Sequence, residues 1–144
     1  KAALEEGIVP GGGVALARMA KSLEDEKLKG YGPDQVGEMV GAKILIEALK
    51  APLQQIAENA GHNGAVVLDK VLSGQGDFGF DAANGNYVNL IDAGIIDPTK
   101  VTRAALQNAV SVASLVLITE VVVAELPKKE EKTLQMPHGM GEEY

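Results

Sequence analysis

Residues 5–16 read Glu-Glu-Gly-Ile-Val-Pro-Gly-Gly-Gly-Val-Ala-Leu, and this stretch decides where the first two helices end and begin. Residues 1–6 are good helix formers, and Gly7 is expected to end their helix. Three consecutive glycines behind Pro10 cannot be stable helix interior, so residues 11–13 are predicted to form a loop that opens a second helix. Glycines in such a place let backbone N–H groups approach a phosphate or a ribose, although the tripeptide alone favours a plain flexible linker.

Apolar residues recur at helical spacing through much of the chain up to residue 72. Pro52 is expected to interrupt this region, because proline lacks the backbone N–H and disfavours helical geometry in the preceding residue. Gly61 is expected to end the helix that follows, with a helix-to-helix turn at residues 62–64. The predicted helices are one with Leu16, Met19, Ala20 and Leu23 on one face, one over residues 36–50, one with the stripe Leu53, Ile56, Ala57 and Ala60, and one over residues 65–72.

From residue 78 to residue 89 the apolar period changes from helical to two, which predicts a pair of strands. Asn84-Gly85 is the strongest short signal for a hairpin turn, and Asp81-Ala82-Ala83 stands just before it. Small residues at a hairpin tip usually serve the turn. They also leave room for a flat base or ring, an interpretation that needs support from elsewhere in the chain.

The last helix is the best specified element. Asp97 is predicted to be its N-cap and Pro98 its first residue. If one Asp97 oxygen accepts backbone N–H groups, the other remains able to face a ligand hydroxyl. Residues 119–126 are β-branched and apolar, which predicts a strand ended by Pro127. That strand has no obvious partner in the chain, so we expect it to pair with a neighbouring subunit or with another part of the polypeptide. A long, almost wholly buried helical stripe is expected at Val101, Ala105, Asn108, Ala109, Val112, Ala113 and Val116.

The composition excludes several classes of function. The chain has 144 residues and a formal net charge of −7, so it lacks the basic surface that DNA or RNA binding requires. It has no cysteine, which rules out disulfides, thiolate metal sites and a cysteine nucleophile. Its two histidines, His62 and His138, are far apart in the sequence, which argues against a histidine-rich metal site. The sequence has no uninterrupted apolar run of about 18 residues, so no membrane-spanning helix is predicted.

The two ends of the chain also carry expectations. The chain begins with Lys1 rather than Met and shows no signal-peptide pattern, which indicates a fragment of a longer protein. Residues 128–144 are polar, with scattered proline and glycine, and are predicted to be a flexible tail. From its residues alone, the chain is a soluble, mainly helical domain with a candidate ligand site.

Four segments of the sequence resemble the group I chaperonins, the GroEL family. They occur in that family's order and spacing between Lys1 and about Pro127, and a chance agreement of that length is not credible. The segments are Glu-Glu-Gly-Ile-Val-Pro-Gly-Gly-Gly-Val-Ala-Leu at residues 5–16, Ala-Pro-Leu-Gln-Gln-Ile at 51–56, Phe-Gly-Phe-Asp-Ala-Ala at 78–83 and Gly-Ile-Ile-Asp-Pro-Thr-Lys-Val-Thr-Arg at 94–103.

The resemblance implies a mainly α fold, a helical bundle like the chaperonin equatorial domain, with a small β-hairpin and a C-terminal strand. Residues 1–7 would be the end of the intermediate-domain or hinge helix. Residues 8–127 would form the C-terminal half of the equatorial domain, which binds ATP and makes ring contacts. Residues 128–144 would be the flexible tail, which lacks the repeated Gly-Gly-Met ending common in the family.

For a nucleotide site, the resemblance implies roles for five residues. Gly12 would lie in the loop beside the nucleotide, Asp81, Ala82 and Ala83 would flank the base and sugar, and Asp97 would hold the ribose hydroxyls. Many bacterial relatives have Asn at the place of Asp81, so its contact is expected to be less direct or through water. The implied cofactor is ATP with Mg²⁺, whose ligands are expected outside this chain, as is the aspartate that activates the attacking water. The chain alone is therefore expected to have no ATPase activity.

The function that the resemblance implies is that of an ATP-dependent chaperone. It would fold client proteins in two stacked seven-membered rings capped by a co-chaperonin. Client and co-chaperonin contacts would belong to an apical domain outside this chain, and no nucleic acid or membrane partner is implied. A bacterial cytoplasmic location is expected, with an organelle matrix or stroma as alternatives. Two rival interpretations stay open: a ring-assembly scaffold with little nucleotide contact of its own, and a free-standing helical binding module.

Overall fold

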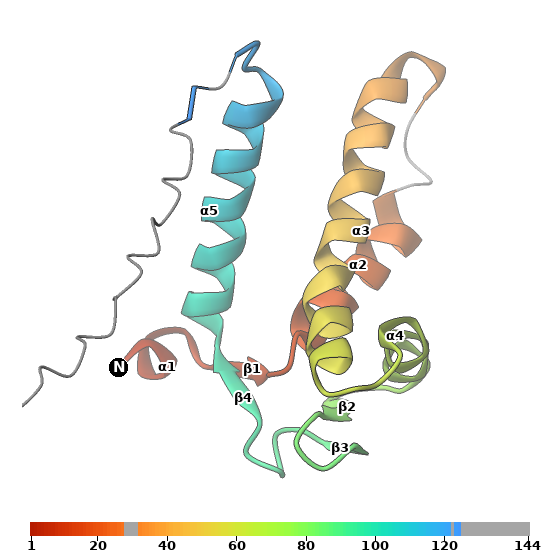
Figure 1. Ribbon diagram of the computed structural model, residues 1–144, viewed down its shortest axis with the longest axis vertical. Helices are drawn as coiled ribbons and strands as arrows, with labels where there is room; N and C mark the ends of the chain where they lie inside the picture. The colour runs from red at the N-terminus through yellow and green to blue at the C-terminus, as the bar shows by residue number, and fades with distance from the viewer. Residues whose placement is uncertain (28–31, 122, 125–144) are drawn as a thin grey trace, which may run out of the picture.

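The computed structural model describes residues 1–27, 32–121 and 123–124 of the chain. In chain order, its elements are α1 (Ala2–Glu6), β1 (Ile8–Pro10), α2 (Val14–Lys27), a 3₁₀ turn η1 (Pro33–Gln35), α3 (Val36–Asn59), α4 (Gly64–Ser73), β2 (Phe78–Asp81), β3 (Asn86–Asn89), β4 (Ile96–Pro98) and α5 (Thr99–Leu117). The two longest helices, α3 and α5, rise from a base that holds α1, α4 and the four short strands (Figure 1). The predicted mainly α fold with a small hairpin is confirmed.

The main core lies where α2, α3, α4 and the β2–β3 hairpin meet. Its buried members are Val14, Ala17, Leu53, Ala57, Val67, Leu68, Val71, Phe80 and Leu90. A smaller cluster of Ala20, Ile46 and Leu49 continues upward between α2 and α3, and Leu106 of α5 packs against it. The core is aliphatic with one buried phenylalanine, as a chain with two Phe and no Trp requires.

The buried face of α2 differs from the predicted one. Val14, Ala17 and Ala20 are fully buried, whereas Met19 is 43% exposed. Small alanine side chains let α2 lie close to α3, while Leu16 and Leu23 pack against the edge of the smaller cluster. The predicted face is therefore confirmed for Leu16, Ala20 and Leu23, which lie in or against the smaller cluster, and is wrong for Met19.

Pro52 does not interrupt α3, which runs from Val36 to Asn59 with the proline inside it. The prediction of two helices was wrong because the halves on either side of Pro52 bury one continuous stripe, Ile46, Leu49, Leu53 and Ala57. The missing N–H would have bonded to the carbonyl of Ala48, an exposed residue whose carbonyl water can hydrate. Burial of the common stripe therefore outweighs the loss of about 3 kcal/mol that an interior proline causes.

The expected ends of the other helices are confirmed. Gly7, with φ of 79°, ends α1, and Gly61, with φ of 81°, follows the end of α3. The turn that follows leads into α4 as expected. There the Asn63 side chain caps α4 by accepting a hydrogen bond of 3.1 Å from the Val66 N–H.

The predicted hairpin is also confirmed, with Phe80 opposite Tyr87 in its register. Its turn has four residues, 82–85, rather than the two of a tight Asn-Gly turn, and Gly85 takes a positive φ of 69°. A second pair of strands was not predicted from the sequence. β1 runs antiparallel to β4 with Val9 opposite Asp97, and three-residue strands carry too little alternation to be recognised.

The stripe expected to be buried on α5 is exposed in this chain. α5 has no buried residue, and Val112 and Val116 are 62% and 60% exposed. α3 and α5 instead border an apolar groove of about 530 Å³, here called the α3–α5 groove. Its lining includes Ile44, Leu45 and Leu49 of α3 and Leu106, Val110 and Leu117 of α5.

The strand predicted at residues 119–126 does not form where the structure describes this segment, at residues 119–121, 123 and 124. A strand needs a neighbour for its backbone groups, and the described part of the chain offers it none. The rest of that segment and the predicted tail, residues 128–144, lie outside the described residues. Within the described ranges, no helix is long and apolar enough to cross a membrane.

Candidate functional site

The glycine loop, residues 11–13, is fixed to the start of the last helix through β1 and β4. β1 leads directly into the loop and pairs with β4, which places Pro10 opposite Ile96. The ladder continues one step further, because the Gly11 N–H donates a hydrogen bond of 2.9 Å to the Ile95 carbonyl. The loop and β4 are therefore neighbours, although they lie far apart in the sequence.

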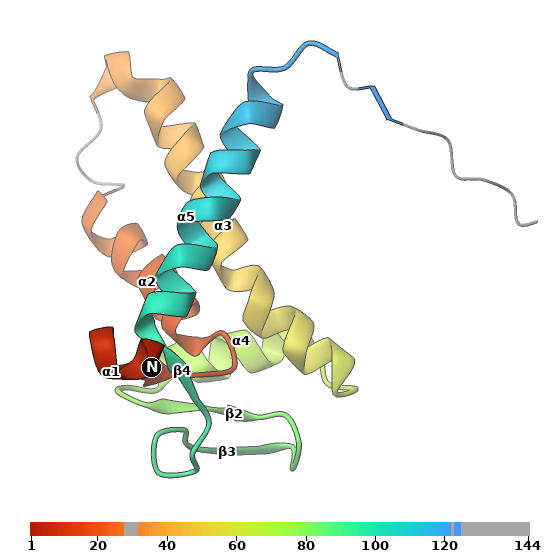
Figure 2. The same cartoon turned by 90° about the vertical axis from the view of Figure 1, so that its left-hand side faces the viewer.

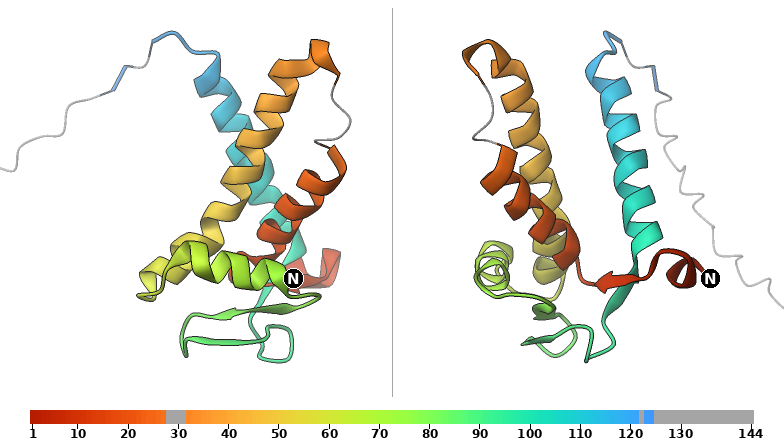
Figure 3. Two further views of the ribbon diagram at one scale, coloured as in Figure 1. Left: turned by 90° about the vertical axis from the view of Figure 1, so that its right-hand side faces the viewer. Right: turned by 180° about the vertical axis from the view of Figure 1, so that it is seen from behind.

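Gly12 faces the hairpin. A Cβ atom on Gly12 would lie 3.8 Å from the Phe80 carbonyl oxygen, and the residue has a φ of 62°, which favours glycine. Phe80 immediately precedes Asp81, so the glycine loop lies beside the end of β2 from which the candidate residues follow. Figure 3 shows from two sides that β1, β4 and the hairpin gather at the same end of the molecule.

The Asp81 carboxylate organises the hairpin turn. One oxygen accepts hydrogen bonds from the backbone N–H groups of Ala83 (2.9 Å) and Asn84 (3.3 Å), and the other accepts one of 2.7 Å from the Asn84 side chain. The hydrogen bond from the Asn84 amide, helped by the two backbone N–H groups, lowers the pKa of Asp81 below its ordinary value of 3.8. Asp81 therefore stabilises the turn, which is the usual role of residues at a hairpin tip.

Ala82 and Ala83 take different places in that turn. Ala82 is half-buried and packs against the main core, whereas Ala83 is exposed and gives its N–H to Asp81. Neither side chain extends beyond Cβ, so the tip of the hairpin carries no bulky side chain at these two positions. This is compatible with a flat group lying over it.

Asp97 is not the N-cap of α5, so that prediction was wrong. Pairing with β1 keeps Asp97 extended within β4, and the helix begins at Thr99 after an extended Pro98. The first helical N–H, that of Thr99, is satisfied by the Gly7 carbonyl at 3.1 Å instead of by a side chain. Asp97 is half-buried, and its carboxylate accepts no hydrogen bond from any residue that the structure describes. Both carboxylate oxygens therefore remain available to a ligand.

The structure thus brings the candidate residues together in part. Gly12 approaches the hairpin next to Asp81, and Asp97 lies across the β1–β4 ladder from the strand that feeds the glycine loop. None of the five candidate residues lines the α3–α5 groove, and none lines the open hollow of about 610 Å³ between α1 and α5. The contact between the three segments is established, and a cleft shared by Gly12 and Asp97 stays a prediction.

Two basic residues of α2, neither of them predicted from the sequence, contact the hairpin side of the molecule. Arg18 donates to the carbonyls of Gly74 (3.1 Å) and Phe78 (2.8 Å), and Lys21 donates to the carbonyl of Leu72 (2.6 Å). Nothing in the local sequence marks them, because their partners are backbone carbonyls on a distant segment.

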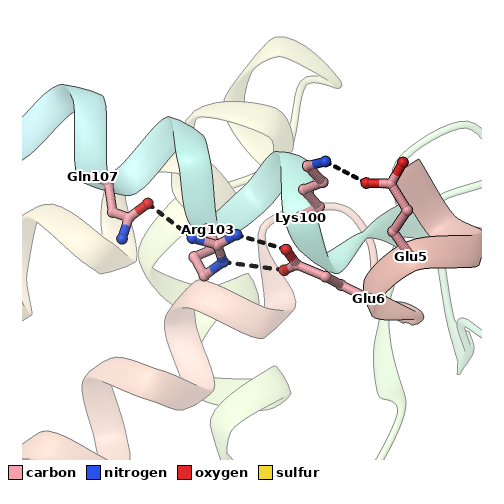
Figure 4. A network of polar contacts seen from close by, with 5 residues as sticks. All are labelled: Glu5, Glu6, Lys100, Arg103 and Gln107. Carbon is pink, nitrogen blue, oxygen red and sulfur yellow. Dashed lines mark hydrogen bonds and ion pairs between the residues drawn. The ribbon is translucent and has the colours of Figure 1, made fainter. Parts of the chain in front are cut away.

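A third polar contact joins α1 to α5 close to Asp97. Arg103 holds the Glu6 carboxylate with two nitrogens, at 2.6 Å and 3.1 Å, and Lys100 pairs with Glu5 (Figure 4). The hydrogen bond from Arg103 lowers the pKa of Glu6 below its ordinary value of 4.5. Within the described ranges, no three acidic or histidine side chains gather in a group that could hold a metal ion.

Comparison with known proteins points to one family. Residues 1–127 match the family model described as the TCP-1/cpn60 chaperonin family. Among solved structures, a group III chaperonin in the open state shares 32% sequence identity over 84% of this chain, with a TM-score of 0.71. The open-state monomer of a group II chaperonin from Methanococcoides burtonii has a TM-score of 0.70 over 78% of this chain, and at 22% identity it shows similarity of fold. The chain spans 25% and 28% of those two proteins, respectively.

Proposed function

Because the chain belongs to the TCP-1/cpn60 chaperonin family, we propose that it is the C-terminal half of the ATP-binding equatorial domain of a chaperonin. In this proposal residues 1–7 end the helix that comes from the intermediate domain, and residues 8–127 belong to the equatorial domain. The α3–α5 groove supports this division. Its apolar lining would be covered by the N-terminal half of the same domain.

The observation that carries the nucleotide proposal is the meeting of the glycine loop, the hairpin and the start of α5. Backbone N–H groups of a glycine-rich bend at the start of α2 suit the phosphate side of a nucleotide. The low hairpin tip at residues 81–83 suits the base and sugar. The free carboxylate of Asp97 suits the ribose hydroxyls, because an ionised carboxylate accepts strong hydrogen bonds from hydroxyl groups. Gly12, Asp81, Ala82, Ala83 and Asp97 would therefore bind ATP by positioning it.

The Mg²⁺ that accompanies ATP would be held by residues outside this chain. Mg²⁺ bound there would neutralise phosphate charge during transfer of the terminal phosphoryl group. The residues of this chain supply binding and orientation of the sugar and base, so the chain alone is proposed to lack ATPase activity. In the intact protein, differential affinity of the ring states for nucleotide would drive capture and release of client proteins.

Replacement of Asp97 tests the proposal. In the full-length protein, Asp97→Ala is expected to weaken ATP binding about tenfold or more, because a charged hydrogen-bond acceptor is lost. Asp92→Ala serves as the matched control, since it removes the same charge from an exposed position on the loop before β4. Binding is measured by titration calorimetry and ring assembly by size-exclusion chromatography. Equal ATP affinity in the two variants, with rings intact, would exclude Asp97 from the site.

The segments quoted for residues 5–16, 51–56, 78–83 and 94–103 support group I within the family. The protein would then assemble two stacked seven-membered rings, bind a separate co-chaperonin and clients through its apical domain, and work in the bacterial cytoplasm or in an organelle matrix or stroma. Ring symmetry measured by electron microscopy and ATP-dependent binding of a co-chaperonin test this finer assignment. Rings of another size that bind no co-chaperonin would contradict it.

A second candidate function is a ring-assembly scaffold with little nucleotide contact. Two observations favour it: all three hydrogen bonds of the Asp81 carboxylate are internal to the turn, and most apolar side chains of α5 are exposed. The Asp97 experiment separates the two functions. Lost assembly with unchanged ATP affinity in the remaining protomers favours the scaffold.

A further inference from the structure

The edge of β2 that faces away from β3 is met by Arg18 of α2 and by the glycine loop. In an antiparallel pair, every second residue bonds to the partner strand and the residues between point their backbone groups outward. The Leu90 N–H donates to the Asp77 carbonyl at 2.9 Å, so Asp77, Gly79 and Asp81 are the residues that face β3. The carbonyls of Phe78 and Phe80 therefore point to the outer edge.

Two residues of one short segment meet these two carbonyls. The Arg18 guanidinium donates to the Phe78 carbonyl at 2.8 Å, and Gly12 comes up against the Phe80 carbonyl. Gly12 and Arg18 are separated only by the end of the glycine loop and the first turn of α2. The outer edge of β2 is thus held at one point by Arg18 and approached at the next by the loop.

Arg18 also holds the segment that leads into β2. Its second terminal nitrogen donates to the carbonyl of Gly74, the residue that ends α4, at 3.1 Å. A cation at this place is favoured, because the C-terminal end of a helix carries partial negative charge. Lys21 contacts the same helix end, at the Leu72 carbonyl, but it does not touch β2. Arg18 is therefore the residue that ties α4 and β2 to α2 at one point.

The burial of Arg18 makes these two contacts costly to lose. The side chain is half-buried, and its Nε atom is shielded from solvent with no hydrogen-bond partner among the described residues. The guanidinium thus makes its hydrogen bonds through its two terminal nitrogens, one to each carbonyl. A lysine carries a single ammonium, which does not present the fixed fork that reaches two separate acceptors.

We propose that Arg18 is a positioning residue of the nucleotide site: it sets the separation between the glycine loop and the hairpin tip at residues 81–83. This inference rests on the proposed function. In the proposed site the phosphates lie at the glycine loop and the base lies at the hairpin tip. The distance between these two segments therefore governs how well a nucleotide of given size fits. Arg18 would act through the hairpin, because its two hydrogen bonds go to the Gly74 and Phe78 carbonyls.

The experiment compares Arg18→Met, Arg18→Lys and Lys21→Met in the full-length protein. Arg18→Met is expected to raise the KM for ATP about tenfold and to lower the ratio of kcat/KM for ATP to kcat/KM for GTP. The kcat should change less than about threefold, because positioning is lost while the catalytic groups stay. Arg18→Lys should lie between Arg18→Met and the unaltered protein. Lys21→Met, which removes a similar contact from α4, should lower the unfolding temperature without changing the KM.

Each result decides the question. Equal KM values and equal ATP preference in Arg18→Met and Lys21→Met would overturn the positioning role and leave Arg18 a structural contact. Should Arg18→Met fail to assemble, Arg18→Lys decides in its place, and an unchanged KM there would also overturn the role. Failure of the proposed function looks different, because the ATP affinity of Asp97→Ala would then equal that of Asp92→Ala.

Discussion

At the scale of single residues, Gly13 is the position where two separate demands meet. Its φ of 78° lies in the region that other residues rarely adopt, and a Cβ atom there would lie 2.7 Å from the backbone nitrogen of Leu53 in α3. The backbone of a helix cannot move to relieve this clash, whereas the end of a flexible side chain could. Gly13→Ala is therefore expected to lower the free energy of unfolding by about 3 kcal/mol or more. Urea unfolding of the full-length protein measures it.

Gly61→Ala is the matched control for that substitution. Gly61 has nearly the same φ, 81°, but a Cβ atom there would meet nothing within 4 Å. Its replacement should cost about 1 kcal/mol, which is the conformational part alone. If the two substitutions destabilise the protein equally, the close approach of the glycine loop to α3 contributes nothing to stability.

These residues also show what the sequence can and cannot predict locally. A run of three glycines predicts a loop because no other structure suits it, but which glycine touches α3 depends on the packed fold. Asp97 before Pro98 was a sound local signal for a helix cap. It failed because β1, from the other end of the sequence, holds Asp97 extended and Gly7 supplies the acceptor that the cap would have given.

At the scale of elements, α1 is held to α5 by charged side chains rather than by buried apolar surface. α1 has no buried residue, and the two-nitrogen contact of Arg103 with Glu6 is its most specific link to α5. Arg103→Met is expected to let α1 open, with amide hydrogen exchange in residues 2–6 about fivefold faster or more. Mass spectrometry of deuterium uptake at about neutral pH measures it. Lys100→Met, which removes the single-point contact with Glu5, is the control and should have a smaller effect.

The pH dependence of that contact has a definite sign. Arg103 lowers the pKa of Glu6, so its stabilisation is fully present above the ordinary value of 4.5 and is lost as the pH falls through the lower folded value. The difference in unfolding temperature between the unaltered protein and Arg103→Met should therefore shrink in acid. A difference that stays constant down to about pH 3 would show that the ion pair is not its source.

Elements were predicted well where their signals are local and poorly where their packing decides. Gly7, Gly61 and Asn63 mark helix ends by their own conformational and hydrogen-bonding preferences, and those ends are confirmed. Pro52 sends an equally strong local signal, but the stripe buried on both sides of it keeps α3 in one piece. The α5 stripe was identified correctly as apolar, and its burial was wrong because no residue that the structure describes covers it.

At the scale of the whole molecule, the α3–α5 groove is an apolar surface that the described residues leave open. Ile44 and Val110 lie on its opposite walls and are 62% and 44% exposed, respectively. Apolar surface of this kind favours association when it is left open, and it stabilises the fold when a further segment covers it. We propose that the N-terminal half of the equatorial domain covers the groove. A charged substitution in the groove should then improve the solubility of the isolated chain and destabilise the full-length protein.

The double substitution Ile44→Glu with Val110→Glu tests this. In the isolated chain it should reduce self-association, seen as a smaller mass in light scattering and less binding of an apolar dye, because charge replaces open apolar surface. In the full-length protein the same change should destabilise the equatorial domain by several kcal/mol and prevent ring assembly, because two carboxylates would be buried without partners. Gln55→Glu with Gln107→Glu, at exposed positions of the same two helices outside the groove lining, is the matched control for added charge. If the full-length protein tolerates the groove substitutions as well as the control ones, the groove is open in the assembled protein and the proposed domain division is wrong.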